Sequence, residues 1–78
     1  SEHGTRFLVF SDGITEQFND DGEMFGVDGL LHSFRSTLEA SPAEMVKLIV
    51  QDLNRFRRTA LIKDDQTLLA IDFTGGDA

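Results

Sequence analysis

Residues 7–13 read Phe7-Leu8-Val9-Phe10-Ser11-Asp12-Gly13, an unbroken apolar run followed by a small polar residue, an aspartate and a glycine. Apolar residues that run on rather than alternate are typical of a strand buried on both faces. The Asp-Gly pair predicts a turn where this strand ends. The stretch therefore predicts a buried strand with a carboxylate at its tip.

A similar stretch lies near the other end of the chain, where Asp64-Asp65-Gln66-Thr67 precedes an apolar run that ends at Phe73. The alternation of this run predicts a strand over residues 67–73, with Leu69, Ile71 and Phe73 on one face. If the two strands are neighbours, Asp12 and Asp64 meet at one edge of the sheet. Carboxylates at strand ends can hold hard divalent cations. If the strands are not neighbours, the two acidic stretches are ordinary turns.

The segment between the strands predicts a loop and a first helix. Residues 17–26 are polar and contain two glycines, so we expect a loop that Phe18, Met24 and Phe25 pin to the body of the protein. Apolar residues then recur at helical spacing from Val27 to Leu38. This spacing predicts a helix of about three turns.

The second predicted helix has the clearer start signal. Ser41 is a good N-cap, Pro42 suits the first helical position, and Glu44 completes a Ser-x-x-Glu capping box. Its end is marked by arginines, which complement the helix dipole and could also contact a phosphate or an acidic partner. The apolar stripe of this helix comprises Met45, Val46, Ile49, Val50, Leu53 and Phe56, and the arginines are Arg55, Arg57 and Arg58.

The predicted order is strand, loop, helix, helix, strand, which makes an α+β fold in which the two strands are antiparallel. Two helices can cover only one face of a sheet, and a two-stranded sheet is marginal by itself. A chain of 78 residues is one domain at most and buries a modest share of its surface. We therefore expect a piece of a larger sandwich, or a chain that self-associates.

Composition narrows the function classes. The formal net charge is −7, from 14 acidic and 7 basic residues, which disfavours nonspecific nucleic-acid binding and suits cations or basic partners. The absence of cysteine fits a reducing, cytoplasmic setting, and His3 and His32 stand too far apart for a zinc cluster. No apolar run approaches a membrane span, and no signal peptide is visible, so we expect no membrane association.

Residues 7–16 resemble the strand-[ST]-D-G-h-x-E segment of the PPM metal-dependent protein phosphatases, the type 2C serine/threonine phosphatases. The resemblance is closest to the bacterial branch of sporulation and stress-response regulators. Residues 19–26 are similar to that branch's Asn-x-x-Gly-x-x-Phe-Gly loop, and residues 63–71 resemble its closing [DN]-D-x-T-h-h-h segment. Each motif is weak, but the ordered set covers nearly the whole chain.

The resemblance implies an α-β-β-α sandwich with two Mn2+ or Mg2+ ions at one sheet edge, which activate a water that attacks phosphoserine or phosphothreonine. It implies that Asp12 and Asp64 bind metal, and that Gly13, Asp65 and Glu16 support the site. It also implies signal transduction through a phosphorylated protein substrate, such as an anti-sigma-factor antagonist.

The chain departs from the family pattern in three respects. It has no second strand-aspartate-glycine unit, no acidic residue matching the family's first ligand and no upstream phosphate-binding arginine. Residues 1–78 therefore resemble the C-terminal portion of the catalytic domain, which we expect to be inactive without the remainder of the domain or a homodimer partner.

Two other functions stay open. One is a non-catalytic interaction module that self-associates or docks a signalling partner through its helices or its strand edge. The other is an acidic calcium-binding fold, because residues 20–23 form an acidic loop. That loop lacks the Asp-x-Asp-x-Asp-Gly…Glu spacing of an EF-hand.

Overall fold

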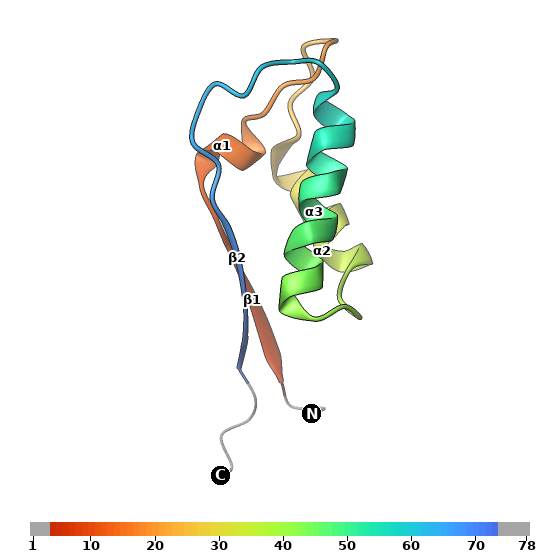
Figure 1. Cartoon of the computed structure of the whole chain (residues 1–78), viewed down its shortest axis with the longest axis vertical. Coiled ribbons are helices and arrows are strands. Elements are labelled where there is room, and N and C mark those ends of the chain that lie inside the picture. Colours follow the sequence, from red (N-terminus) through yellow and green to blue (C-terminus); the bar gives the residue numbers. More distant parts are fainter. Residues whose placement is uncertain (1–3, 74–78) are drawn as a thin grey trace.

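The structure is a computed structural model that describes residues 4–73. Strand β1 (Thr5–Phe10) leads into the short helix α1 (Asp12–Thr15), and helices α2 (Gly26–Ser36) and α3 (Pro42–Arg57) precede strand β2 (Leu68–Phe73). The two strands pair antiparallel, and α2 and α3 lie on one side of them (Figure 1). The predicted α+β fold and its element order are confirmed. The sequence Gly75-Gly76-Asp77-Ala78 predicts a frayed end, and these residues lie outside the described part of the chain.

The sheet has one covered face and one open face. The register pairs Phe7 with Ile71 and Val9 with Leu69, so these side chains share a face. Residues on the opposite face, Leu8, Leu68 and Ala70, pack against the core beneath the helices. The open face carries large apolar side chains with about half of their surface exposed: Phe7 49%, Val9 49%, Leu69 51% and Phe73 58%. The prediction that both faces are buried is therefore wrong for the described residues, because two helices cover one face only.

The core lies between the sheet and the two long helices. Three residues of the predicted α3 stripe, Met45, Ile49 and Leu53, are almost fully buried, whereas Val50 remains 39% exposed. The predicted N-cap is confirmed, since the Ser41 side chain accepts a hydrogen bond from the Glu44 backbone N–H at 3.2 Å. The other buried apolar residues of the core are Ile14, Phe25 and Leu30.

Three local predictions need correction. Asp12 and Gly13 do not form a turn but open helix α1, and they do so because the chain continues into the buried residues Ile14 and Thr15. Of the residues expected to pin the loop, only Phe25 is buried. Phe18 and Met24 instead form an isolated antiparallel bridge, and their side chains are 45% and 51% exposed. Helix α2 ends at Ser36, two residues before the predicted end at Leu38.

Arginines tie the segments together. The Arg57 guanidinium donates to the Ala60 carbonyl at 2.8 Å and to Asn54 Oδ1 at 3.2 Å, which supports a helix-end role for this residue. On β1, Arg6 forms a two-point ion pair with Asp72 of β2 and also donates to the Ala40 carbonyl. Arg6 thereby links both strands to the connection between α2 and α3.

Candidate functional site

The two strands leave the sheet together at one edge, and Ser11 fastens that edge. The Ser11 backbone N–H donates to the Thr67 carbonyl at 3.0 Å. Its hydroxyl accepts from the Thr67 N–H at 2.9 Å and donates to the Asp65 carbonyl at 3.1 Å. The segments that carry Asp12 and Asp64 therefore start from the same edge, as the hypothesis of neighbouring strands requires.

Gly13 is the point at which these two segments touch. A Cβ atom at Gly13 would lie 2.2 Å from the Asp65 carbonyl oxygen and 3.3 Å from that of Asp64. No side chain fits in that space, so glycine is required by the close approach of the two backbones. The Asp-Gly pair predicted a turn at Gly13, and the family resemblance implied that Gly13 supports the metal site. The structure shows instead a direct contact with the connection that leads into β2.

Two glutamines that the sequence analysis did not single out hold the same region. Gln66 Nε2 donates to the Gly13 carbonyl at 3.0 Å and to Gln17 Oε1 at 2.8 Å. Gln17 is only 4% exposed, and its Nε2 donates to the carbonyls of Phe18 and Leu61. Glutamine is mostly a surface residue, so no feature of the sequence marked either position as a structural clasp.

Asp12 and Asp64 are both exposed, at the start of α1 and in the connection before β2 respectively. Within residues 4–73, neither carboxylate takes part in a side-chain hydrogen bond or an ion pair, so both oxygens are available to a cation. Carboxylate oxygens are the ligands that Mg2+ and Mn2+ prefer. The chemistry of these two residues therefore fits such a metal.

The remaining predicted residues surround this edge. Asp65 contributes its carbonyl to Ser11, while its side chain is exposed. Glu16 is exposed and follows α1, with its N–H bonded to the Asp12 carbonyl at 2.8 Å. The described part of the chain contains no cluster of three or more acidic, histidine or cysteine side chains placed to hold a metal. Residues 4–73 thus supply two candidate ligands.

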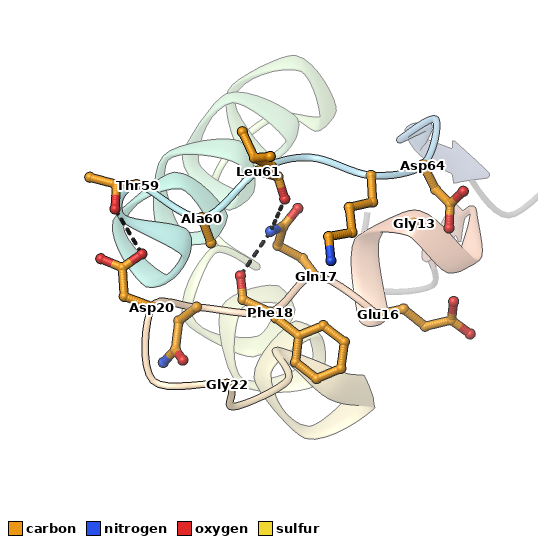
Figure 2. Close-up of a pocket in the computed structure, with 12 residues that line it drawn as sticks. Gly13, Glu16, Gln17, Phe18, Asp20, Gly22, Thr59, Ala60, Leu61 and Asp64 are labelled. Atoms are coloured by element: carbon orange, nitrogen blue, oxygen red, sulfur yellow. Dashed lines mark hydrogen bonds between the residues drawn. The ribbon is translucent and has the colours of Figure 1, made fainter.

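An open cavity of about 940 Å³ lies beside this edge. Figure 2 shows the side chains of Glu16 and Asp64 on the α1 side of the cavity, with the Phe18 ring between Glu16 and Gly22. The cavity joins the predicted metal edge to the loop that follows α1. Its lining comprises Gly13, Glu16, Gln17, Phe18, Asn19, Asp20, Gly22, Thr59, Ala60, Leu61, Lys63 and Asp64.

None of the helices in the described residues is long and apolar enough to cross a membrane. Comparison with curated proteins and with solved structures gave no significant match. Comparison with protein-family models matched residues 1–74 to the family described as stage II sporulation protein E (SpoIIE). The match covers all of the described residues and includes both acidic segments of the sheet edge. The chain therefore belongs to the SpoIIE family of type 2C-like phosphatase domains.

Proposed function

We propose that this chain is part of a metal-dependent protein phosphatase that hydrolyses phosphoserine or phosphothreonine. The observation that carries the proposal is the shared sheet edge, where Ser11 and Gly13 bring the Asp12 segment against the Asp64–Asp65 segment. Membership of the SpoIIE family supports phosphatase chemistry at this edge.

In this proposal Asp12 and Asp64 hold Mn2+ or Mg2+. A bound divalent ion supplies a water of lowered pKa as the nucleophile and offsets the charge on the phosphate. The chain's own residues position the ligands: Ser11 fixes the Asp65 backbone, and Gly13 permits the close contact that keeps the two ligand segments together. Glu16 follows Asp12 by one helical turn, where its N–H donates to the Asp12 carbonyl, and we assign it to orienting the loop that follows α1.

We also propose that further ligands come from residues outside the described part of the chain. Magnesium takes six oxygen ligands and is commonly held by one or two carboxylates together with waters and substrate phosphate, so Asp12 and Asp64 could hold one ion, whereas a two-ion site needs further ligands. The open apolar face of the sheet supports a larger body, because Phe7, Val9, Leu69 and Phe73 would be covered by a second sheet in an α-β-β-α sandwich. The isolated chain should accordingly be inactive.

The proposed substrate is a phosphorylated regulatory protein, such as an anti-sigma-factor antagonist. The family description places relatives of this chain in sporulation, and the resemblance to the bacterial regulatory branch supports that class of substrate.

Activity of the complete protein on a phosphoserine substrate tests the proposal. Asp12→Ala and Asp64→Ala should each lower the Mn2+-dependent kcat by about 100-fold or more. Loss of a residue that only hydrogen-bonds to a metal ligand typically costs about 10–100-fold in activity, and loss of the ligand itself should cost at least as much. Asp28→Ala is the matched control, because Asp28 is an exposed aspartate in the first turn of α2. Full activity of both the Asp12→Ala and the Asp64→Ala variants would contradict the assignment of a metal site to this sheet edge.

The open sheet face also favours a second function, a non-catalytic module that binds a partner or another copy of itself. Light scattering of the chain distinguishes this function from the first. A dimer or partner complex of the chain, together with unchanged phosphatase activity of the complete protein in its Asp12→Ala and Asp64→Ala variants, would favour the interaction module over the enzyme.

A further inference from the structure

The cavity beside the metal edge has the form of a groove with two different ends. Its walls are the loop that follows α1 and the connection between α3 and β2. In Figure 2 the side chains of Asp20 and Thr59 lie at one end, and those of Glu16 and Asp64 lie at the other. We call this feature the Asp20–Asp64 groove. It leads directly to the proposed metal edge.

Hydrogen bonds across the groove hold its two walls in place. The Gln17 side chain bridges them by donating to the Phe18 carbonyl at 2.8 Å and to the Leu61 carbonyl at 3.1 Å. At the far end, the Thr59 hydroxyl donates to Asp20 Oδ1 at 2.9 Å. A ligand that enters the groove therefore meets walls that are already ordered, which lowers the entropic cost of binding.

The walls combine apolar and acidic side chains. Phe18 is 45% exposed and Leu61 is 75% exposed, and both line the groove. Asp20 is exposed and retains oxygen lone pairs beyond the one used by Thr59. An apolar side chain would be partly removed from water against Phe18 and Leu61, and a cationic side chain would be attracted to Asp20.

The charges along the groove have an order that suits a phosphorylated polypeptide. Lys63 precedes Asp64 in the chain and is the one basic residue among those that line the groove, whose other charged residues are Glu16, Asp20 and Asp64. Asp20 lies at the other end, where a positive side chain of the same polypeptide would be placed. The net charge of −7 further attracts basic partners.

We propose that the Asp20–Asp64 groove binds the segment of the phosphoprotein substrate that flanks the phosphorylated residue, and that it selects an apolar residue and an arginine or lysine in that segment. The inference rests on the proposed phosphatase function. It assigns Phe18 and Leu61 to the apolar contact and Asp20 to the basic residue, so these three residues determine specificity rather than chemistry.

The test uses the complete protein with two classes of substrate. The first class comprises phosphoserine peptides that carry leucine and arginine beside the phosphoserine, placed before it in one peptide and after it in another. A matched set of peptides carries glutamate in place of the arginine. The second is p-nitrophenyl phosphate, which is too small to fill the groove. The quantity compared is the kcat/KM for the peptide divided by that for p-nitrophenyl phosphate.

Asp20→Lys should lower this ratio about fivefold for the arginine peptide, through KM, and raise it for the glutamate peptide. Leu61→Ala should lower it about fivefold for both peptides, because both carry leucine. The matched control is Asp21→Lys, since Asp21 is the exposed neighbour of Asp20 but does not line the groove. Its ratios should equal those of the unmodified protein.

Two results would overturn the inference: equal effects of Asp20→Lys and Asp21→Lys, or an unchanged ratio in Leu61→Ala. If either result occurs while p-nitrophenyl phosphate is still hydrolysed normally, the substrate-binding role of the groove is refuted and the proposed phosphatase function is not. Absence of Mn2+-dependent hydrolysis of any substrate by the unmodified protein would refute the proposed function and the groove together. The Asp20 carboxylate both accepts the hydrogen bond from Thr59 and carries the charge proposed to attract the basic residue. Thr59→Val removes the hydrogen bond but keeps the charge, so it shows which of the two accounts for an effect of Asp20→Lys.

Discussion

Gly13 is the residue on which the geometry of the sheet edge depends. Alanine is the better helix former by about 1 kcal/mol, and Gly13 lies within α1, so propensity alone would favour Gly13→Ala. The new methyl group, however, would lie 2.2 Å from a backbone carbonyl oxygen, and a backbone atom cannot move aside as a flexible side chain can. The steric cost therefore exceeds the gain in propensity.

We expect Gly13→Ala to lower the free energy of unfolding by about 1–3 kcal/mol, as overpacked sites do. Urea unfolding of the complete protein measures this change. Gly22→Ala is the control, because Gly22 has open space around its Cβ position and a φ of +78°. Its cost is the left-handed backbone alone, about 1 kcal/mol. Gly13→Ala that proves as stable as the unmodified protein would show that the two segments do not touch.

The ion pair between Arg6 and Asp72 gives the fold a dependence on acid. The hydrogen bond from Arg6, reinforced by its charge, holds the pKa of Asp72 below the ordinary value, although partial desolvation opposes this. A carboxyl group with a lowered pKa in the folded state stabilises the fold above its unfolded pKa. That contribution is lost as the pH falls through the folded pKa.

Stability should therefore decline below about pH 4, the ordinary aspartate range, in part through Asp72. Asp72→Asn should flatten the decline, and thermal unfolding between pH 2.5 and 7 measures it. Asp28→Asn serves as a comparison, because Asp28 forms no ion pair with another residue in the range 4–73. An identical pH profile for the Asp72 variant and the unmodified protein would exclude the ion pair as a source of the decline.

Helix α3 is the element whose start is most clearly encoded. Ser41 adopts an extended backbone conformation and caps the Glu44 N–H, and Pro42 takes the first helical position. Ser41→Ala should cost about 1 kcal/mol of unfolding free energy, whereas Ser41→Asp retains a cap acceptor and should cost much less. Urea unfolding of the two variants checks this difference. Equal losses would mean that the side-chain cap does not stabilise the helix.

The long elements could be predicted from the sequence because their signals are local. The apolar spacing of Met45, Ile49 and Leu53 and the run Phe7–Phe10 depend only on neighbouring residues. Helix α1 could not be predicted in the same way, because Asp-Gly after a strand is usually a turn and the helix depends on burial of Ile14. The end of α2 was misjudged by two residues because the apolar Leu38 continued the helical pattern.

The candidate site was predictable in part. The positions of Asp12 and Asp64 at one edge follow from strand pairing, which the apolar runs made plausible. The clasp made by Gln17 and Gln66 was not predictable, since it depends on contacts between residues 49 positions apart. The hydrogen bonds of Ser11 with Asp65 and Thr67 were not predicted for the same reason, because these residues lie 54 and 56 positions from Ser11 in the chain.

At the scale of the whole molecule, the question is whether the open sheet face is covered in the complete protein. A covered face would make this chain part of a larger sandwich, and an uncovered face would make it a self-sufficient fold. Val9 on that face and Leu38 after α2 are each 49% exposed in the described residues. If a second sheet covers the face, Val9→Lys buries a charge in the complete protein and should cost several kcal/mol. Leu38→Lys, equally exposed here, should change stability by about 0.5 kcal/mol or less.

Thermal or urea unfolding of the complete protein measures both variants. Similar small effects for Val9→Lys and Leu38→Lys would show that the face stays open to water, and would favour the interaction module over the sandwich. A large effect for Val9→Lys alone supports the larger body that the proposed two-metal site would require.

The central claim is that one sheet edge carries Asp12 and Asp64 to a common metal site. Paramagnetic Mn2+ titrated into the isotope-labelled complete protein tests it most directly, because Mn2+ broadens the NMR signals of nuclei near it. We predict that the amide signals of Asp12, Gly13 and Asp64 broaden at the lowest Mn2+ concentrations, while those of Asp28 and Glu39 remain sharp. Broadening spread over all exposed acidic residues, or beginning in the loop 20–23, would contradict the claim.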